Sequence, residues 1–188
     1  YSASNAIVIG KGAGVSGSNS ISIGLKNDIS GSNSIVIGQN SRLGLNAHNS
    51  LSIGTGSNDY VDSITIGKDN GTSGPYSLVI GNESSGSSNS VVLGHNASNA
   101  SSADNSISIG SNSQTTESDS VTIGTGNTNS GRDAVAIGTN INTVASESVT
   151  IGKESSTIGT KSIALGHSTS AAINSVGIGY DVSASSST

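Results

Sequence analysis

A five-residue motif recurs thirteen times along this 188-residue chain and constrains the fold more than any other feature. Each copy reads small residue, branched apolar residue, variable residue, Ile or Leu, and then Gly, as in Ser20-Ile21-Ser22-Ile23-Gly24. The closing glycines are separated by 13 to 16 residues, most often by 14. A repeat this short cannot bury an apolar face alone, so successive copies must stack on one another. The sequence therefore predicts a solenoid.

Within each motif the apolar residues alternate, which is the pattern of a strand with one face in a core. Val121 and Ile123, for example, are expected to point into the core together. A second, weaker strand follows, with Val15, Ile29 and Leu43 at its apolar position in the early turns. Two strands of about five residues and two tight corners account for about 14 residues per turn. The sequence thus predicts an all-β, flattened, two-stranded parallel β-roll.

Corner residues can be located because turn formers precede most copies of the motif. Asn and Asp tolerate the left-handed backbone conformation that a corner needs. These residues are Asn5, Asn19, Asn33, Asn49, Asp62, Asn89, Asn105, Asp119, Asp133 and Asn174. The opening position of the motif is Ser eleven times and Ala twice, which indicates that a small side chain is required there.

The middle position of each motif, as in Ser22, Val36 and Thr65, is never charged, never Asn and never bulky. If the flanking Ile and Val side chains fill the core, these middle side chains point outward. An outward face of so polar a chain should carry some Asn, Lys or Glu. We therefore interpret the small residues as a second packed surface, where identical chains meet, and predict a homo-oligomer.

Composition excludes several classes of protein. The net charge is −5 and the pI about 4.9, and without Lys/Arg clusters the chain is not expected to bind nucleic acid or anionic membranes. The chain has no Cys, so it has no disulfides. It shows neither a signal peptide nor a long apolar run, and it starts in mid-pattern. We therefore expect residues 1–188 to be one domain excised from a longer protein.

Candidate ligand-binding residues lie in the irregular turns, because insertions in a solenoid form outward loops. Two turns are about two residues longer than the rest, and two tyrosines, which suit contact surfaces, lie between Gly54 and Gly81. The candidates are Arg42, Leu45, His48, Tyr60, Tyr76, Asn99, Ser101 and Asp104. Neutral surface bulges explain the two loops equally well. Tyr76 also stands where a corner Asn usually stands, which suits a structural role.

Catalytic and metal-binding patterns are weak. His48, His95 and His167 are far apart in the sequence, so we expect exposed corner histidines rather than a metal site. The segment Gly10-Lys11-Gly12-Ala13-Gly14 lacks the Gly-Lys-Ser/Thr of a phosphate-binding loop, and a calcium-binding repeat is absent. The sequence predicts no enzyme, no metal and no cofactor.

Three copies of the motif carry a resemblance to a known family. Asn33-Ser-Ile-Val-Ile-Gly38, Asp133-Ala-Val-Ala-Ile-Gly138 and Lys161-Ser-Ile-Ala-Leu-Gly166 resemble the head repeat of YadA-like trimeric autotransporter adhesins, proteins of type Vc secretion. The period and the small-residue half-turn match too. The resemblance implies a left-handed parallel β-roll, a homotrimer, and a place on the outer membrane of a Gram-negative bacterium. The family's signal peptide, coiled-coil stalk and membrane anchor would lie outside this chain.

The same resemblance implies a function in virulence and cell adhesion. Family members attach bacteria to collagen, fibronectin, laminin or CEACAM receptors, or to one another, and a head presented three times gains avidity from weak contacts. Two alternatives remain. A segment of a phage or appendage fibre would use the same roll. An ice-binding solenoid would need a regular array of threonines, whereas Thr65, Thr122 and Thr150 are isolated among Ser, Val and Ala.

Overall fold

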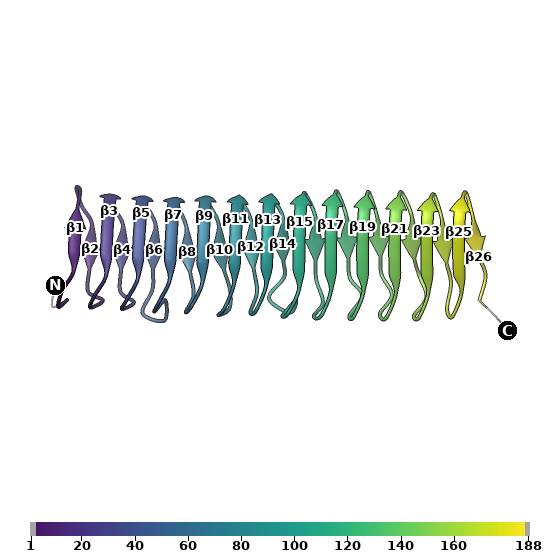
Figure 1. Ribbon diagram of the computed structural model, residues 1–188, viewed down its shortest axis with the longest axis horizontal. Coiled ribbons are helices and arrows are strands. Elements are labelled where there is room, and N and C mark those ends of the chain that lie inside the picture. Colours follow the sequence, from purple (N-terminus) through teal and green to yellow (C-terminus); the bar gives the residue numbers. More distant parts are fainter. Residues whose placement is uncertain (1–2, 187–188) are drawn as a thin grey trace. The chain divides into compact units, whose positions relative to one another are not determined.

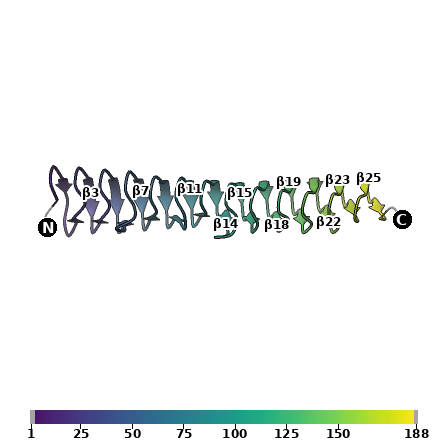
Figure 2. The same ribbon diagram turned by 90° about the horizontal axis from the view of Figure 1, so that it is seen from below.

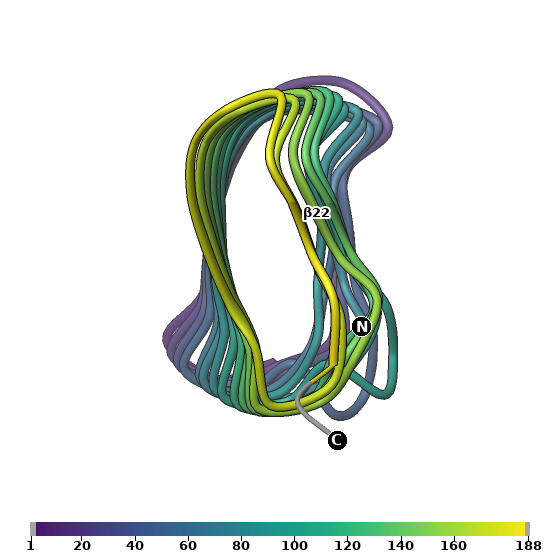
Figure 3. The same cartoon turned by 90° about the vertical axis from the view of Figure 1, so that its right-hand side faces the viewer.

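The computed structural model describes residues 3–186, and within this range it consists of strands and turns. The chain divides into two compact units, Tyr1–His95 and Asn96–Thr188, and each is a stack of parallel turns. Every complete turn contains one long and one short strand (Figure 1). Seen end-on, a turn is a flattened ring (Figure 3). The predicted parallel β-solenoid with a period of about 14 residues is thus confirmed.

Long and short strands alternate along the first unit. Its long strands are β1 (Ile7–Ile9), β3 (Ile21–Leu25), β5 (Ile35–Gln39), β7 (Leu51–Thr55), β9 (Ile64–Lys68), β11 (Leu78–Asn82) and β13 (Val91–His95). Its short strands are β2 (Gly14–Val15), β4 (Asp28–Ile29), β6 (Arg42–Leu43), β8 (Asn58–Asp59), β10 (Gly71–Thr72) and β12 (Ser85–Gly86).

The second unit repeats this pattern. Its long strands are β15 (Ile107–Ser111), β17 (Val121–Thr125), β19 (Val135–Thr139), β21 (Val149–Lys153), β23 (Ile163–His167) and β25 (Val176–Tyr180). Its short strands are β14 (Ser98–Asn99), β16 (Gln114–Thr115), β18 (Thr128–Asn129), β20 (Asn142–Thr143), β22 (Ser156–Thr157), β24 (Ser170–Ala171) and β26 (Ser183–Ala184). Within each unit the long and the short strands form two separate layers (Figure 2).

The long strands keep one register whatever the length of the turn between them. Ile35 pairs with Ile21 across a 14-residue turn and with Leu51 across a 16-residue turn, and Leu51 pairs with Ile64 across 13 residues. Differences in turn length are therefore absorbed outside the long strands. The motif defines the register, because its Gly pairs with the Gly of the next turn, as Gly24 does with Gly38 and Gly38 with Gly54.

The second strand of each turn has two residues rather than the five we expected. The backbone curves immediately after it. The N–H groups of both Ser16 and Gly17 donate to the carbonyl of Ile29, at 2.8 and 3.3 Å. Two successive donors can share one acceptor only where the chain bends, so the ladder ends there and the remaining residues form a corner.

The two faces of the long strands are reversed relative to our prediction. The middle residue Val36 is 0% exposed, whereas its neighbours Ile35 and Ile37 are 36% and 41% exposed. Val121 and Ile123 likewise lie on the outer face, each partly exposed. The expectation that they fill the core was wrong, and so was the argument that the middle residues form a surface between chains. Those residues are small because the interior between the two layers is narrow.

The interior combines a small apolar cluster with many hydrogen-bonded polar groups. Val15, Ile29, Leu43 and Val36 are all at most 4% exposed and pack together, which confirms the apolar position predicted in the second strand. Elsewhere the interior holds apolar side chains such as Val79 and Val92 in some turns and hydroxyl groups in others. Thr115 Oγ1, for example, donates to Thr122 Oγ1 at 2.7 Å. A polar interior is stable when its groups find partners inside.

Side chains and backbone at the corners confirm the roles inferred for the motif residues. Ser20 Oγ donates to the carbonyl of Gly31 at 3.1 Å and accepts from the N–H of Ser34 at 3.2 Å, so it links two turns in a space that admits only a small residue. All ten predicted corner Asn and Asp residues have positive φ, as at Asn19 with 56°. Gly24 has φ 128°, and a Cβ there would lie 1.8 Å from the carbonyl oxygen of Gly38.

Candidate binding surfaces

The outer face of the long strands carries two parallel rows of Ile, Val and Leu in each unit. We call these rows the apolar face; they comprise the first and third residues of every long strand. Exposed fractions reach 58% at Ile9 and 41% at Ile37 in the first unit, and 40% at Ile151 and 65% at Ile178 in the second. Soluble monomers rarely expose contiguous apolar patches of this kind. The apolar face is therefore a candidate site for association.

The first long loop is a tight turn with an apolar tip. The N–H of Ala47 donates to the carbonyl of Gly44 at 3.0 Å, and Ala47 itself is 1% exposed. Leu45 at the tip is 75% exposed. Buried Leu43 and Ala47 anchor the loop on both sides, and it protrudes beyond the neighbouring turns as the blue loop in Figure 3. Of the predicted site residues, Leu45 lies in the protruding loop, whereas the exposed Arg42 on β6 precedes it and the exposed His48 follows it.

The second long loop has the same construction. The N–H of Ala103 donates to the carbonyl of Ala100 at 2.8 Å, and Ala103 is 0% exposed. Ser101 is exposed at the tip, and Asp104 is partly buried. Asn99, however, is 2% exposed, and its Nδ2 donates inward to the carbonyl of Ser106 at 3.1 Å. The expectation that Asn99 lies on an exposed loop was wrong, because the inserted residues come after it.

The two candidate tyrosines occupy different positions in the first unit. Tyr60 follows β8 and is 37% exposed, and its N–H donates to Thr72 Oγ1 at 2.7 Å. Tyr76 is 62% exposed and stands at a corner with φ 59°, where its N–H donates to the carbonyl of Val61 at 3.2 Å. The corner position of Tyr76 is therefore confirmed. Its ring remains on the surface, so the structural role does not prevent contact with a ligand.

Asp59 is a buried carboxylic acid in the interior of the first unit. It pairs with Leu43 of the preceding turn, at the position that is apolar in the early turns, and it is 6% exposed. Burial raises its pKa from 3.8 to about 7, opposed by the nearby hydroxyl of Thr65. Neither carboxylate oxygen makes a hydrogen bond with good geometry, so desolvation dominates. Sequence reasoning did not single out Asp59, although it stands at the position that is apolar in the early turns.

A row of side-chain amides runs along the corner that precedes the long strands of the first unit. Asn5 Nδ2 donates to Asn19 Oδ1 at 3.2 Å, and the same bond joins Asn19 to Asn33 and Asn33 to Asn49. Asn49 donates in turn to the carboxylate of Asp62 at 2.8 Å. Every bond runs in the same direction along the chain, so Asp62 closes the row as an acceptor.

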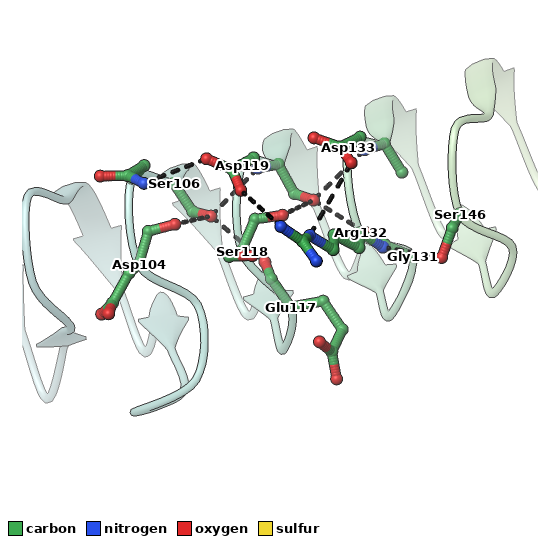
Figure 4. A network of polar contacts seen from close by, with 12 residues as sticks. Asp104, Ser106, Glu117, Ser118, Asp119, Gly131, Arg132, Asp133 and Ser146 are labelled. Carbon is green, nitrogen blue, oxygen red and sulfur yellow. Dashed lines mark hydrogen bonds and ion pairs between the residues drawn. The ribbon is translucent and has the colours of Figure 1, made fainter.

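The corresponding corner of the second unit ends in ion pairs (Figure 4). Asn105 Nδ2 donates to Asp119 Oδ1 at 3.0 Å. Arg132 lies between two carboxylates, 3.9 Å from Asp119 and 3.8 Å from Asp133. All three charged side chains are at least 37% exposed, so each pair contributes little to stability.

A shallow polar hollow lies over the short strands of the second unit. It has a volume of about 210 Å³ and is lined by Asn96, Ser98, Asn112, Gln114 and Thr128. These residues come from three consecutive turns. Our sequence reasoning missed this hollow, because it searched for loops and charged groups. The signal in the sequence was a run of turns whose outward residues are all amides, hydroxyls or glycines.

The histidines do not form a metal site. His48 is exposed, and its Nδ1 accepts from the N–H of Ser32 at 2.9 Å. His167 stacks on Tyr180 with ring centroids 5.1 Å apart, and its Nε2 lies 3.6 Å from Glu154. Among residues 3–186, no three His, Cys, Asp or Glu side chains gather closely enough to hold a metal ion. The same range contains no apolar helix of membrane-spanning length.

Two segments of this chain are similar to a known family of repeats. The family profile described as the YadA head domain repeat matches two copies, over residues 2–27 and 101–127. These two segments are similar to YadA head repeats. A comparison with curated proteins gave no match. The YadA head segments 2–27 and 101–127 fall in different units, and each includes two closing glycines of the motif.

YadA head repeats belong to adhesin heads that have no enzymatic activity. The solenoid described above is consistent with the head of a trimeric autotransporter adhesin, exposed at the cell surface. Turns outside the two matched segments pair in the same register and repeat the same motif, as from β5 to β13 in the first unit. The two matched segments therefore share their motif and their register with the turns around them.

Proposed function

We propose that this chain is the head of a homotrimeric bacterial adhesin that binds a host protein, with autoaggregation as a second activity of the same surface. The observation that carries the proposal is the pair of YadA head repeats in a solenoid with an exposed apolar face. The full protein is proposed to reside at the outer membrane, with its anchor outside this chain. It carries out no catalysis and contacts the membrane only through that anchor.

Trimer formation rests on the apolar face. A single unit leaves side chains such as Ile37 and Ile151 about 40% exposed, although each exposed Å² of apolar surface costs about 25 cal/mol relative to burial. Packing the apolar faces of three chains around a common axis removes these rows from water. The second and fourth residues of the motif, which are the first and third residues of each long strand, thus have the role in association that we first assigned to the middle residues.

Ligand contact is proposed for the opposite layer. With the apolar face at a trimer axis, the short strands and the two protruding loops are directed outward. Leu45 and Tyr76, which are 75% and 62% exposed, are apolar or aromatic groups of the kind that anchor protein interfaces. Each trimer presents every such group three times, which converts weak single contacts into avidity. Collagen, fibronectin, laminin and CEACAM-type receptors are the proposed classes of ligand.

A binding screen tests this function. The purified chain is titrated against immobilised collagen, fibronectin, laminin and CEACAM ectodomains, and its mass in solution is measured by light scattering. We expect a trimer and saturable binding to one of these proteins. Leu45→Ser should weaken binding if the first loop contacts the ligand. Ser101→Ala, at an exposed position of the second loop, is the comparison variant. A monomer that binds none of the panel would contradict the proposal and favour a spacer in a fibre.

A further inference from the structure

Two outward positions of each turn, over the short strands, are uncharged in four consecutive turns of the second unit. From Asn96 to Asn142, the corner residue after each long strand and the outward residue of each short strand are Asn, Gln, Ser, Thr or Gly. We call this surface the amide face. Other turns carry charges at the same two positions, such as Asp28 and Arg42 in the first unit and Glu154 in the second. Neutral pairs also occur in single turns elsewhere, as at Ser168 and Ser170, but only here are four such turns consecutive among the described residues.

The hollow described above lies in the amide face, and its rim is partly fixed by internal hydrogen bonds. Asn96 Nδ2 donates to Asn112 Oδ1 at 2.9 Å, and Asn112 Nδ2 donates to Ser111 Oγ at 3.3 Å. Both Asn residues are held at corners with φ of 50° and 52°. The orientation of these amides is thus set before any ligand arrives, which lowers the entropy cost of binding.

We propose that the amide face binds a neutral, hydroxyl-rich glycan, with one sugar unit in the hollow. This inference rests on the proposed function as an adhesin head and names a ligand class for it. Amides and hydroxyls both donate and accept hydrogen bonds, as sugar hydroxyls do. A volume of about 210 Å³ is below the range of about 300–1,000 Å³ for pockets that enclose a whole drug-sized ligand. It suits one unit of a longer chain.

The geometry of the sheet favours a glycan over a peptide. Neighbouring strands are about 4.8 Å apart, so equivalent side chains such as Ser98, Gln114 and Thr128 form a row with that repeat. One sugar unit of an extended β-linked glycan has a comparable length, so successive units meet successive turns. A bound peptide would need apolar pockets for its side chains, and the five residues that line this hollow are all polar. The amide face also lies on the layer opposite the apolar face, so a trimer leaves it open.

Titration with soluble oligosaccharides tests the proposal. The probes are cellohexaose and the hexamer of N-acetylglucosamine, with hexagalacturonate as an anionic control, and binding is followed by calorimetry. We expect saturable binding of a neutral hexamer and none of the anionic one. Gln114→Ala and Thr128→Val each remove hydrogen-bonding groups and should weaken binding about threefold to tenfold. Ser170→Ala, at the outward position of β24 outside the hollow, is the matched control and should leave binding unchanged.

Two further binding experiments identify the source of the glycan. Retention of the chain on amorphous cellulose or chitin would indicate a structural polysaccharide, and retention on a desialylated glycoprotein would indicate a cell-surface glycan. Equal binding of neutral and anionic hexamers, or unaltered affinity in both hollow variants, would overturn the inference. Binding in the protein panel would then leave the adhesin proposal standing. If the chain bound neither a protein of the panel nor a sugar, both the adhesin proposal and the glycan inference would be overturned.

Discussion

Replacing Asp59 by Asn tests whether a carboxylic acid is buried in the solenoid interior. The folded-state pKa of about 7 lies above the value of 3.8 expected in the unfolded chain, a difference of about three units. At about 1.36 kcal/mol per unit, this corresponds to about 4 kcal/mol. The folded state holds the proton more tightly, so the stabilisation is complete below pH 3.8 and is lost as pH rises through about 7.

Asp59→Asn should therefore flatten this part of the pH dependence. The amide has nearly the same shape as the acid and never ionises. Relative to the parent, the variant should gain up to about 4 kcal/mol in free energy of unfolding above pH 7 and little near pH 4. The assay is urea unfolding between about pH 4 and pH 8 at one chain concentration, because association also shifts stability. Hydrogen exchange at the amide of Tyr60, which bonds to Thr72, gives a local measure.

The control variant is Asp28→Asn. Asp28 is exposed on β4, one residue before the interior position, so Asp28→Asn removes a carboxylate from a short strand without changing the interior. The reasoning about Asp59 would be refuted if both variants followed the parent curve at every pH. A uniform loss of stability in Asp59→Asn would also refute it, since the carboxylate would then be making favourable interactions in its charged form.

Four other substitutions test the packing. Val36→Asp places a charge in the interior and should cost about 4 kcal/mol or more in circular dichroism melts, whereas Ile37→Asp on the apolar face should shift a trimer to monomers in sedimentation with the monomer still folded. The opposite pattern would mean that the faces are assigned wrongly. Gly124→Ala should cost at least about 3 kcal/mol, because φ is 126° and the new Cβ would lie 1.8 Å from the carbonyl oxygen of Gly138; an unchanged melt would contradict this close packing. Ser120→Ala removes a buried hydroxyl that donates to a backbone carbonyl at 2.7 Å and should cost about 1–3 kcal/mol of unfolding free energy, less if the site relaxes.

The period of the motif was sufficient to predict the architecture. Spacing indicated parallel stacking, and the Asn and Asp residues before the motif indicated the positive φ of the corners. Alternation also located the strand correctly, but it could not say which face points inward. Hydrophobicity suggested that the Ile side chains point inward. The narrow space between the layers instead admits Ser22 and Val36. Size, not polarity, was the deciding property.

The candidate sites were predicted less well for a physical reason. Turn length revealed both loops, and Leu45 and Ser101 do lie at exposed tips. The point within a long turn where the extra residues leave the ladder depends on backbone hydrogen bonds, so Asn99 was misplaced. The polar hollow arises from side chains 14 to 16 residues apart, which become neighbours only once turns are stacked.

The row of amides from Asn5 to Asp62 also has a consequence for how the protein ages. Each Asn in the middle of the row must donate to the next turn and accept from the previous one, as Asn33 does between Asn19 and Asn49. Deamidation of Asn33 would produce a carboxylate, which can still accept from Asn19 but has no proton to donate. Its oxygen would then face Asn49 Oδ1, and two acceptors would repel each other. Chemical damage at one residue would thus cut the row in two at a corner, while the interior of the turn stayed intact.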